Sequence, residues 1–229
     1  MIASPGAQKR IGSVTSSTPA HQTAYIRLRD MVLFGRLAPG QAVTIEGLVQ
    51  ALGLGMTPVR EAIRRLTAEG ALQLHGNRRV TVPRLNAAQL DELDFARRSI
   101  ESRLAEMSLD FLREEDLVRL ERIDLEVDTA LARGDISDYL EANHRFHFVL
   151  YEASGAEVLL GLTRSLWLRF GPSLRVVCAE PGTVILPDRH KDALRAARDG
   201  DADALARAIR ADIGQGMAQL RARLDGAEI

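Results

Sequence analysis

The chain has 229 residues, of which 46% are hydrophobic, 27% are charged and only 4% are aromatic, a composition typical of a soluble globular protein that is richer in helix than in sheet. Its single cysteine, Cys178, excludes an internal disulfide bond and fits a reducing cytoplasm. No stretch is apolar enough to span a membrane and the N-terminus lacks the apolar core of a signal peptide, so we expect a cytoplasmic protein with no membrane partner.

The net charge of −1 conceals an uneven distribution along the chain. Residues 1–84 carry 11 Lys and Arg against 4 Asp and Glu, whereas residues 85–229 carry 19 against 27. A basic first part suits a polyanion such as double-stranded DNA. The acidic second part must do something else, so the charge pattern predicts two domains with different roles.

The first part of the chain has the order of a helix-turn-helix domain. Residues 1–19 show no apolar period, so we expect a flexible N-terminal arm. Apolar residues recur at helical spacing from about Ala20 to Gly35 and again from Ile45 to Leu52, where Thr44 is the expected N-cap. Gly53 and Gly55 are expected to end the second helix and to separate it from a third.

The third helix, from Thr57 to Leu66, is the expected recognition helix. Pro58 is tolerated in the first turn of a helix, and the apolar residues that follow it make one face. The rest of the surface carries arginines, of which Arg60 is placed to face outward. A helix held by one face in this way suits insertion into the major groove of DNA. Taken alone, the stretch fits an ordinary surface helix with solvated arginines equally well.

A β-hairpin is expected after the third helix. Residues 71–74 and 79–82 alternate in polarity around a short turn with a basic tip. Three helices followed by such a hairpin predict a winged helix-turn-helix domain over residues 20–83. Residues 84–88 are then expected to form a linker.

The motifs of this domain closely resemble those of the GntR family of bacterial transcription regulators. They occur in the family's order over residues 35–78: Gly-Arg-Leu-Ala-Pro-Gly, then Leu-Gly-Leu, the recognition-helix sequence, Glu-Gly and Asn-Arg. Gly55-Met56 departs from the usual Ser-Arg, so the operator sequence cannot be carried over from relatives. The resemblance implies base or phosphate contacts by the recognition helix and a hairpin tip in the minor groove. The predicted DNA-binding residues are Thr57, Arg60, Arg64, Arg65, Asn77, Arg78 and Arg79.

Residues 89–225 are expected to form an all-helical domain. Glycines or Pro-Gly separate its periodic apolar stretches, which cover residues 87–112, 114–132, 136–153, 156–177, 187–198 and 201–224. Six helices with short connections predict an antiparallel bundle, so the whole chain is expected to be mainly α. No phosphate-binding loop, nucleophile elbow or cysteine cluster accompanies them, and we therefore do not expect an enzyme.

The informative motif of the second part is Asn-His-Arg-Phe-His at residues 143–147. Asn143 and His147 lie four residues apart and share one helix face, while His144 and His147 form a competing pair. Further along, His190 opens one expected helix and Asp212 lies midway along the next. On spacing alone, a hydrogen-bonded core histidine and a solvated aspartate are the simpler interpretation.

This part of the chain resembles the FCD domain, the ligand-sensing domain of the FadR subfamily. There an Asp/Asn-x-x-Phe-His motif supplies two metal ligands, and the last helices supply further histidines. The resemblance implies a divalent metal site formed by Asn143, His147, His190 and Asp212. Asp212 stands where a third histidine is usual, and Asn143 where aspartate is commoner. Two imidazoles, a carboxylate and an amide oxygen suit Zn²⁺, Mn²⁺, Ni²⁺ or Fe²⁺.

An arginine of the first bundle helix is a candidate for effector binding. Arg97 and Glu101 match an Arg-x-x-x-Glu pair of the FCD domain. Arg97 can hold an effector carboxylate through two hydrogen bonds, or it can pair with Glu101 to stabilise the bundle. Arg164, Trp167 and Arg169 lie on a later helix, where packing and solvation account for them more simply.

The combined hypothesis is a ligand-responsive DNA-binding transcription regulator, with a repressor favoured. We expect a homodimer on a palindromic operator, because two recognition helices must meet major grooves about 34 Å apart. The expected effector is a small carboxylate or sugar acid held on or near the metal. One alternative is a metal-free pocket in which His147, His190 and Arg97 bind the carboxylate directly. A metal-dependent enzyme with an accessory DNA-binding domain is the less favoured alternative.

Overall fold

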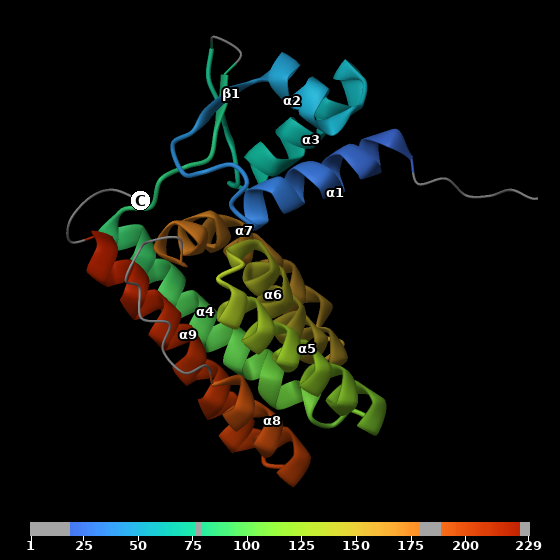
Figure 1. Cartoon of the computed structure of the whole chain (residues 1–229), viewed down its shortest axis with the longest axis vertical. Coiled ribbons are helices and arrows are strands. Elements are labelled where there is room, and N and C mark those ends of the chain that lie inside the picture. The colour runs from blue at the N-terminus through green and yellow to red at the C-terminus, as the bar shows by residue number, and fades with distance from the viewer. Residues whose placement is uncertain (1–18, 77–78, 179–188, 225–229) are drawn as a thin grey trace, which may run out of the picture.

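The computed structural model describes residues 19–76, 79–178 and 189–224, which form nine helices and three short strands (Figure 1). The mainly α fold is confirmed, with a small three-stranded sheet in the N-terminal part and a helical bundle in the C-terminal part. Residues 1–18 of the expected flexible arm, together with Asn77 and Arg78 of the hairpin tip, lie outside the described residues.

The N-terminal part is built on three helices, α1 (Ala20–Leu33), α2 (Ile45–Leu52) and α3 (Met56–Ala68). Helix α3 carries its apolar face against α1 and α2, and its four apolar residues are buried. Helix α3 begins at Met56, one residue before the predicted start at Thr57, and Gly55 is its N-cap. Pro58 occupies the first turn, where its missing N–H is not needed. The opposite face of α3, with its arginines, therefore remains outside the core.

A small antiparallel sheet completes this part, with strands β1 (Ala42–Thr44), β2 (Gln73–Leu74) and β3 (Arg79–Thr81) in the order β1-β3-β2. The two strands of the expected hairpin are present but shorter than predicted. Strand β1 is not predicted from the sequence, because its three residues are too few to show an alternating pattern. Thr44 ends this strand and is also the N-cap of α2, as predicted: its side chain accepts a hydrogen bond from the Gly47 N–H at 3.0 Å.

The bundle contains α4 (Ala87–Ser108), α5 (Glu114–Arg133), α6 (Ile136–Ala153), α7 (Glu157–Cys178), α8 (His190–Asp199) and α9 (Ala202–Leu224). Asn86 and Gln89 cap α4 reciprocally, so that helix begins within the segment expected as a linker. Helices α4 and α9 run side by side in opposite directions, and α8 lies at the end of the bundle remote from the N-terminal part (Figure 1). None of the described helices combines the length and hydropathy that a membrane crossing requires.

The N-terminal part contacts the bundle mainly at helix α7, because α1 packs across α7 (Figure 1). The approach is closest at Gly171, where a Cβ atom would lie 2.4 Å from the backbone oxygen of Leu33. An ion pair between Arg36 and Glu141, at 3.0 Å, adds a second connection to the bundle. The N-terminal part and the bundle are therefore in direct contact through α1 and α7.

Candidate metal centre

Three of the four predicted metal ligands converge from three different helices. His147 comes from α6, His190 is the first residue of α8, and Asp212 comes from α9; one ligand atom of each lies within 4.8 Å of the others. Two ligand atoms that each lie about 2.1 Å from one ion are separated by roughly 3–4 Å. The three side chains therefore need to move little to share a divalent ion.

The orientation of His147 is fixed by Tyr151, one helical turn further along α6. The Tyr151 hydroxyl donates to Glu101 Oε2 at 2.8 Å and lies 3.0 Å from His147 Nδ1. Burial and the neighbouring Glu101 carboxylate raise the pKa of Tyr151 well above its usual value, so the hydroxyl keeps its proton. Its oxygen must then accept the hydrogen bond from His147 Nδ1–H.

With Nδ1 protonated, His147 presents Nε2 to Asp212, whose Oδ2 atom lies 3.2 Å away. Two lone pairs at that distance repel each other unless a proton or a metal ion lies between them. Where a proton lies on Nε2, the hydrogen bond from His147 and the charge of the nearby imidazoles outweigh burial, which alone would raise the pKa of Asp212, and lower that pKa to about 2. Asp212 therefore offers an ionised carboxylate to a cation at this point.

His190 is oriented from the other side by a carboxylate of α5. Its Nδ1 atom lies 3.4 Å from Oδ1 of Asp124, and its ring stacks on Phe146 with centroids 3.8 Å apart. Metal-binding histidines commonly direct their second nitrogen to a carboxylate, which sets the ring orientation and raises the basicity of the ligating nitrogen. His147 thus has a hydrogen-bonded partner at its second nitrogen, and His190 has a carboxylate within ion-pair distance of its second nitrogen.

Asn143, the fourth predicted ligand, is buried and lines the same cavity as His147 and Asp212. The cavity has a volume of about 50 Å³, room for roughly one or two waters. The competing residue His144 is directed elsewhere: its ring stacks on Phe148 at 4.2 Å and lines a separate cavity against α1. The pair that shares this site is therefore Asn143 and His147.

Arg97 lines the same cavity but is already engaged by Glu101. It is 3% exposed, and its Nε and Nη2 atoms donate to the two carboxylate oxygens of Glu101 at 2.6 and 3.3 Å. Its guanidinium also lies 3.9 Å from the centre of the Phe170 ring. The geometry shows the stabilising pair with Glu101, and it leaves effector binding by Arg97 as a prediction.

Several contacts of the site were not predicted from the sequence, which assigns Trp167 to packing and does not single out Tyr151 or Asp124. Trp167 lines the cavity, donates from Nε1 to Glu101 Oε2 at 3.0 Å, and lies 5.4 Å from the His147 ring. Tyr151 was accessible in principle, because it follows His147 by four residues on the same helix face. Asp124 carried no signal in the sequence, because its partner lies on another helix.

The arginines of the predicted DNA-binding surface differ in their surroundings on α3. Arg64 lies 3.7 Å from Glu61, and Arg65 pairs with Glu69 at 3.0 Å while its guanidinium lies 3.6 Å from the Tyr25 ring centre. Arg60 is exposed and takes part in no ion pair within the described part of the chain. Thr57 and Arg79 are also exposed, on α3 and β3.

Comparison with known families accounts for nearly all of the described residues. Residues 20–82 match the model described as bacterial regulatory proteins of the gntR family, and residues 92–215 match the FCD domain. The chain belongs to the GntR family and carries an FCD domain. As a GntR-family protein it is a transcription regulator rather than an enzyme.

Individual relatives of this GntR-family protein agree with that assignment. The HTH-type transcriptional regulator McbR of Escherichia coli K12 is 31% identical over 147 residues, which cover 64% of this chain and 66% of McbR. The regulator YdhC of Bacillus subtilis is 28% identical over 138 residues, which cover 60% and 62%. The chain thus aligns with somewhat less than two thirds of the length of these relatives.

Solved structures extend the likeness to most of the chain. The structure of E. coli McbR/YncC superposes with a TM-score of 0.84 at 25% identity, over 90% of this chain and 99% of that one. A GntR regulator from Rhodococcus sp. RHA1 gives a TM-score of 0.71 at 22% identity over 89% and 98%, which supports the fold alone.

Proposed function

We propose that this GntR-family regulator binds operator DNA through α3 and the wing, and that a small carboxylate bound in its FCD domain controls this binding through a divalent metal ion. The observation that carries the metal site is the convergence of His147, His190 and Asp212. The second nitrogen of His147 lies 3.0 Å from the Tyr151 hydroxyl, and that of His190 lies within ion-pair distance of Asp124. The family membership supports the DNA-binding role.

The donor set fits a borderline or moderately hard divalent ion. Asn143, His147, His190 and Asp212 would supply an amide oxygen, two imidazoles and one carboxylate, which suits Zn²⁺, Mn²⁺, Ni²⁺ or Fe²⁺. When bound, the ion supplies a positive centre for an effector carboxylate. Arg97 lines the same cavity and offers a second cation to that group.

The small volume of the cavity suggests how an effector would be sensed. A cavity of about 50 Å³ is too small for a carboxylic acid of several carbons, which must therefore push the lining apart. Trp167, Phe170 and Leu174 line the cavity from α7, and α7 is the helix against which α1 packs. An effector would thus bind a state in which α7 is displaced, and only such a difference in affinity can shift the protein between two states.

The regulator is proposed to act as a homodimer and as a repressor. Two copies of α3 must reach successive major grooves about 34 Å apart on a palindromic site, which requires two chains. Displacement of α7 by the effector would change the spacing or orientation of the two copies of α3 and release the operator. We place this regulation in the cytoplasm, where a bacterial regulator meets its operator DNA.

Metal analysis combined with thermal unfolding tests this proposal. Purified protein should contain a divalent metal, or take up added Zn²⁺ or Mn²⁺, and metal bound to the folded state should raise the unfolding midpoint. His147→Ala and His190→Ala should abolish this rise and the response to small carboxylic and sugar acids, while gel-shift affinity for operator DNA persists. His21→Ala, an exposed histidine of α1, is the matched control.

One outcome would replace the metal in this proposal by direct binding, and another would contradict the proposal. A wild-type protein that is empty and indifferent to added metal would exclude the metal, and an acid that still raised its midpoint would indicate direct binding by His147, His190 and Arg97. A protein that bound neither metal nor any acid of the screen would contradict the sensing role of this cavity.

A further inference from the structure

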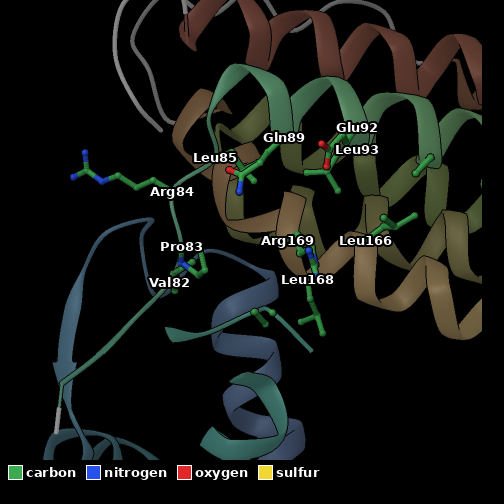
Figure 2. A pocket seen from close by; sticks show the side chains of 13 residues that line it. Val82, Pro83, Arg84, Leu85, Gln89, Glu92, Leu93, Leu166, Leu168 and Arg169 are labelled. Atoms are coloured by element: carbon green, nitrogen blue, oxygen red, sulfur yellow. The ribbon is translucent and has the colours of Figure 1, made fainter. Parts of the chain in front are cut away.

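A second cavity lies at the junction of the N-terminal part and the bundle (Figure 2). Four segments enclose it: the turn after α3, the chain that follows β3, the first half of α4, and the middle of α7. Its lining shares no residue with the candidate metal centre. The proposed function therefore assigns no role to this cavity.

The size of this cavity suits a small molecule better than the metal cavity does. Its volume is about 280 Å³, against about 50 Å³ for the metal cavity. A cavity of about 150 Å³ in a protein core holds one benzene molecule, so this one accommodates roughly eleven non-hydrogen atoms. The walls combine apolar and polar surface in similar proportion, and ligand sites commonly combine both. The apolar part includes Val82, Leu85, Leu93, Leu166 and Leu168.

Polar groups of opposite charge interrupt these apolar walls. Arg169 comes from α7, and Glu92 and Gln89 come from α4 (Figure 2). Arg169 and Glu92 are both exposed, and among the described residues neither takes part in an ion pair. Arg84 extends away from the other labelled side chains, and it packs on Gly40 instead. Arg169 is thus the one cation of the lining that is directed to the junction.

The position of Arg169 depends on the absence of a side chain at Gly70. A Cβ atom on Gly70 would lie 2.6 Å from Arg169 Nη2, and the backbone there has a φ of +75°. Gly70 therefore lets a charged group of the bundle lie directly against the backbone of the N-terminal part. This contact places the guanidinium at the boundary that a ligand in the cavity would bridge.

We propose that this cavity is a second small-molecule site, which takes an amphipathic zwitterion of the size of an apolar α-amino acid. Arg169 and the Gln89 amide bind the carboxylate, Glu92 binds the ammonium group, and the leucine-lined walls bind the side chain. A ligand with a carboxylate alone gains Arg169 but meets the negative charge of Glu92. Because both parts of the protein line the site, the ligand stabilises one particular docking of the winged domain on the bundle.

Titration of the full-length protein with apolar amino acids tests the proposal. Leucine, isoleucine, valine, methionine and phenylalanine are screened by thermal shift, and hits are measured by calorimetry. At least one should raise the unfolding midpoint, and Arg169→Gln should weaken its binding by roughly tenfold or more. Arg164→Gln, an exposed arginine on the same helix that does not line this cavity, is the matched control.

Three further variants show whether the amino acid occupies this cavity or the metal centre. Ala96→Leu fills part of the cavity and should abolish binding, whereas His147→Ala should leave it unchanged. Glu92→Gln should weaken the amino acid but strengthen the matching carboxylic acid without an amino group. The proposal is overturned if no amino acid binds, if binding survives both Arg169→Gln and Ala96→Leu, or if His147→Ala abolishes it. Equal binding of the carboxylic acid by the wild type overturns the zwitterion assignment.

Discussion

The carboxylate of Asp124 lies 3.4 Å from Nδ1 of His190, although the two residues belong to different helices and are 66 positions apart. Asp124 is buried, and its other oxygen lies 3.7 Å from Lys191 Nζ. A buried carboxylate is costly unless it is paired. In this site its Oδ1 atom faces Nδ1 of the His190 ring, which leaves Nε2 as the nitrogen that we propose for metal binding.

Asp124→Asn should therefore weaken metal binding without removing any metal ligand. The amide keeps the shape of the side chain but not its charge, and loss of such a partner typically costs 10–100-fold in metal affinity. Competition with a coloured chelator measures the affinity. Asp128→Asn provides the control, because Asp128 pairs with Lys191 at the surface, at 3.0 Å. If the two variants bind metal equally well, Asp124 does not orient His190.

The sequence names the candidate ligands of this site but not the residues that contact them, and metal binding by these ligands stays a prediction. The helical repeat places Asn143 and His147 on one face, and the FCD resemblance names both of them as ligands together with His190 and Asp212. The support from Asp124 depends on how α5 packs against α8, which no local pattern encodes. Trp167 was assigned to packing for a similar reason, since an apolar periodic position does not reveal a hydrogen bond to Glu101.

Glu101→Ala should destabilise the fold strongly. Glu101 is fully buried and receives hydrogen bonds from Arg97, Tyr151 and Trp167. Its removal leaves the buried Arg97 charge without its partner, which costs about 3–5 kcal/mol of unfolding free energy. Urea denaturation followed by tryptophan fluorescence measures the change.

The control for this variant lies on the same helix. Glu106 pairs with Arg103 at 2.6 Å on a much more exposed face, so Glu106→Ala should cost about 1 kcal/mol or less. If Glu101→Ala also lowers the unfolding free energy by less than about 1 kcal/mol, Arg97 must gain access to water or to another acceptor. The buried pair of Arg97 and Glu101 would then not be what stabilises this cavity.

Arg60→Ala should weaken specific DNA binding by about 1–3 kcal/mol, the scale of a two-hydrogen-bond contact to a base. Arg60 is the arginine of α3 that no acid engages in the described structure, so it is the one best placed to read a base. Arg64→Ala should instead weaken binding to specific and unrelated sequences alike and lower the salt dependence, as expected for a phosphate contact. Fluorescence anisotropy at several salt concentrations distinguishes the two; unchanged operator affinity of Arg60→Ala rejects the assignment.

The order of elements in the winged domain was largely predictable, and its missing strand shows where prediction ends. Pro58 and the apolar repeat fix where α3 starts and which face it buries. Strand β1 exists because Val43 pairs with Val80, a contact between distant segments, and Ala42–Thr44 has no strand pattern of its own. The cavity beside Gly70 was equally inaccessible to sequence reasoning, because segments from both parts of the chain line it.

Gly171→Ala should disturb the docking of the two parts of the protein. The added Cβ atom would lie 2.4 Å from the backbone oxygen of Leu33, and a backbone atom cannot move aside as a flexible side chain can. Helices α1 and α7 must separate, which should cost about 1–3 kcal/mol as other overpacked sites do. Gly161→Ala is the matched control on the same helix: nothing lies within 4 Å of its Cβ position, so it should be neutral or stabilise by up to about 1 kcal/mol. Urea denaturation compares the two variants, and operator affinity measured on the same samples shows whether the altered docking reaches α3. Equal stability of the two variants would mean that α1 is not held against α7 at this point, and the proposed route from Trp167 to the winged domain would lose its mechanical basis.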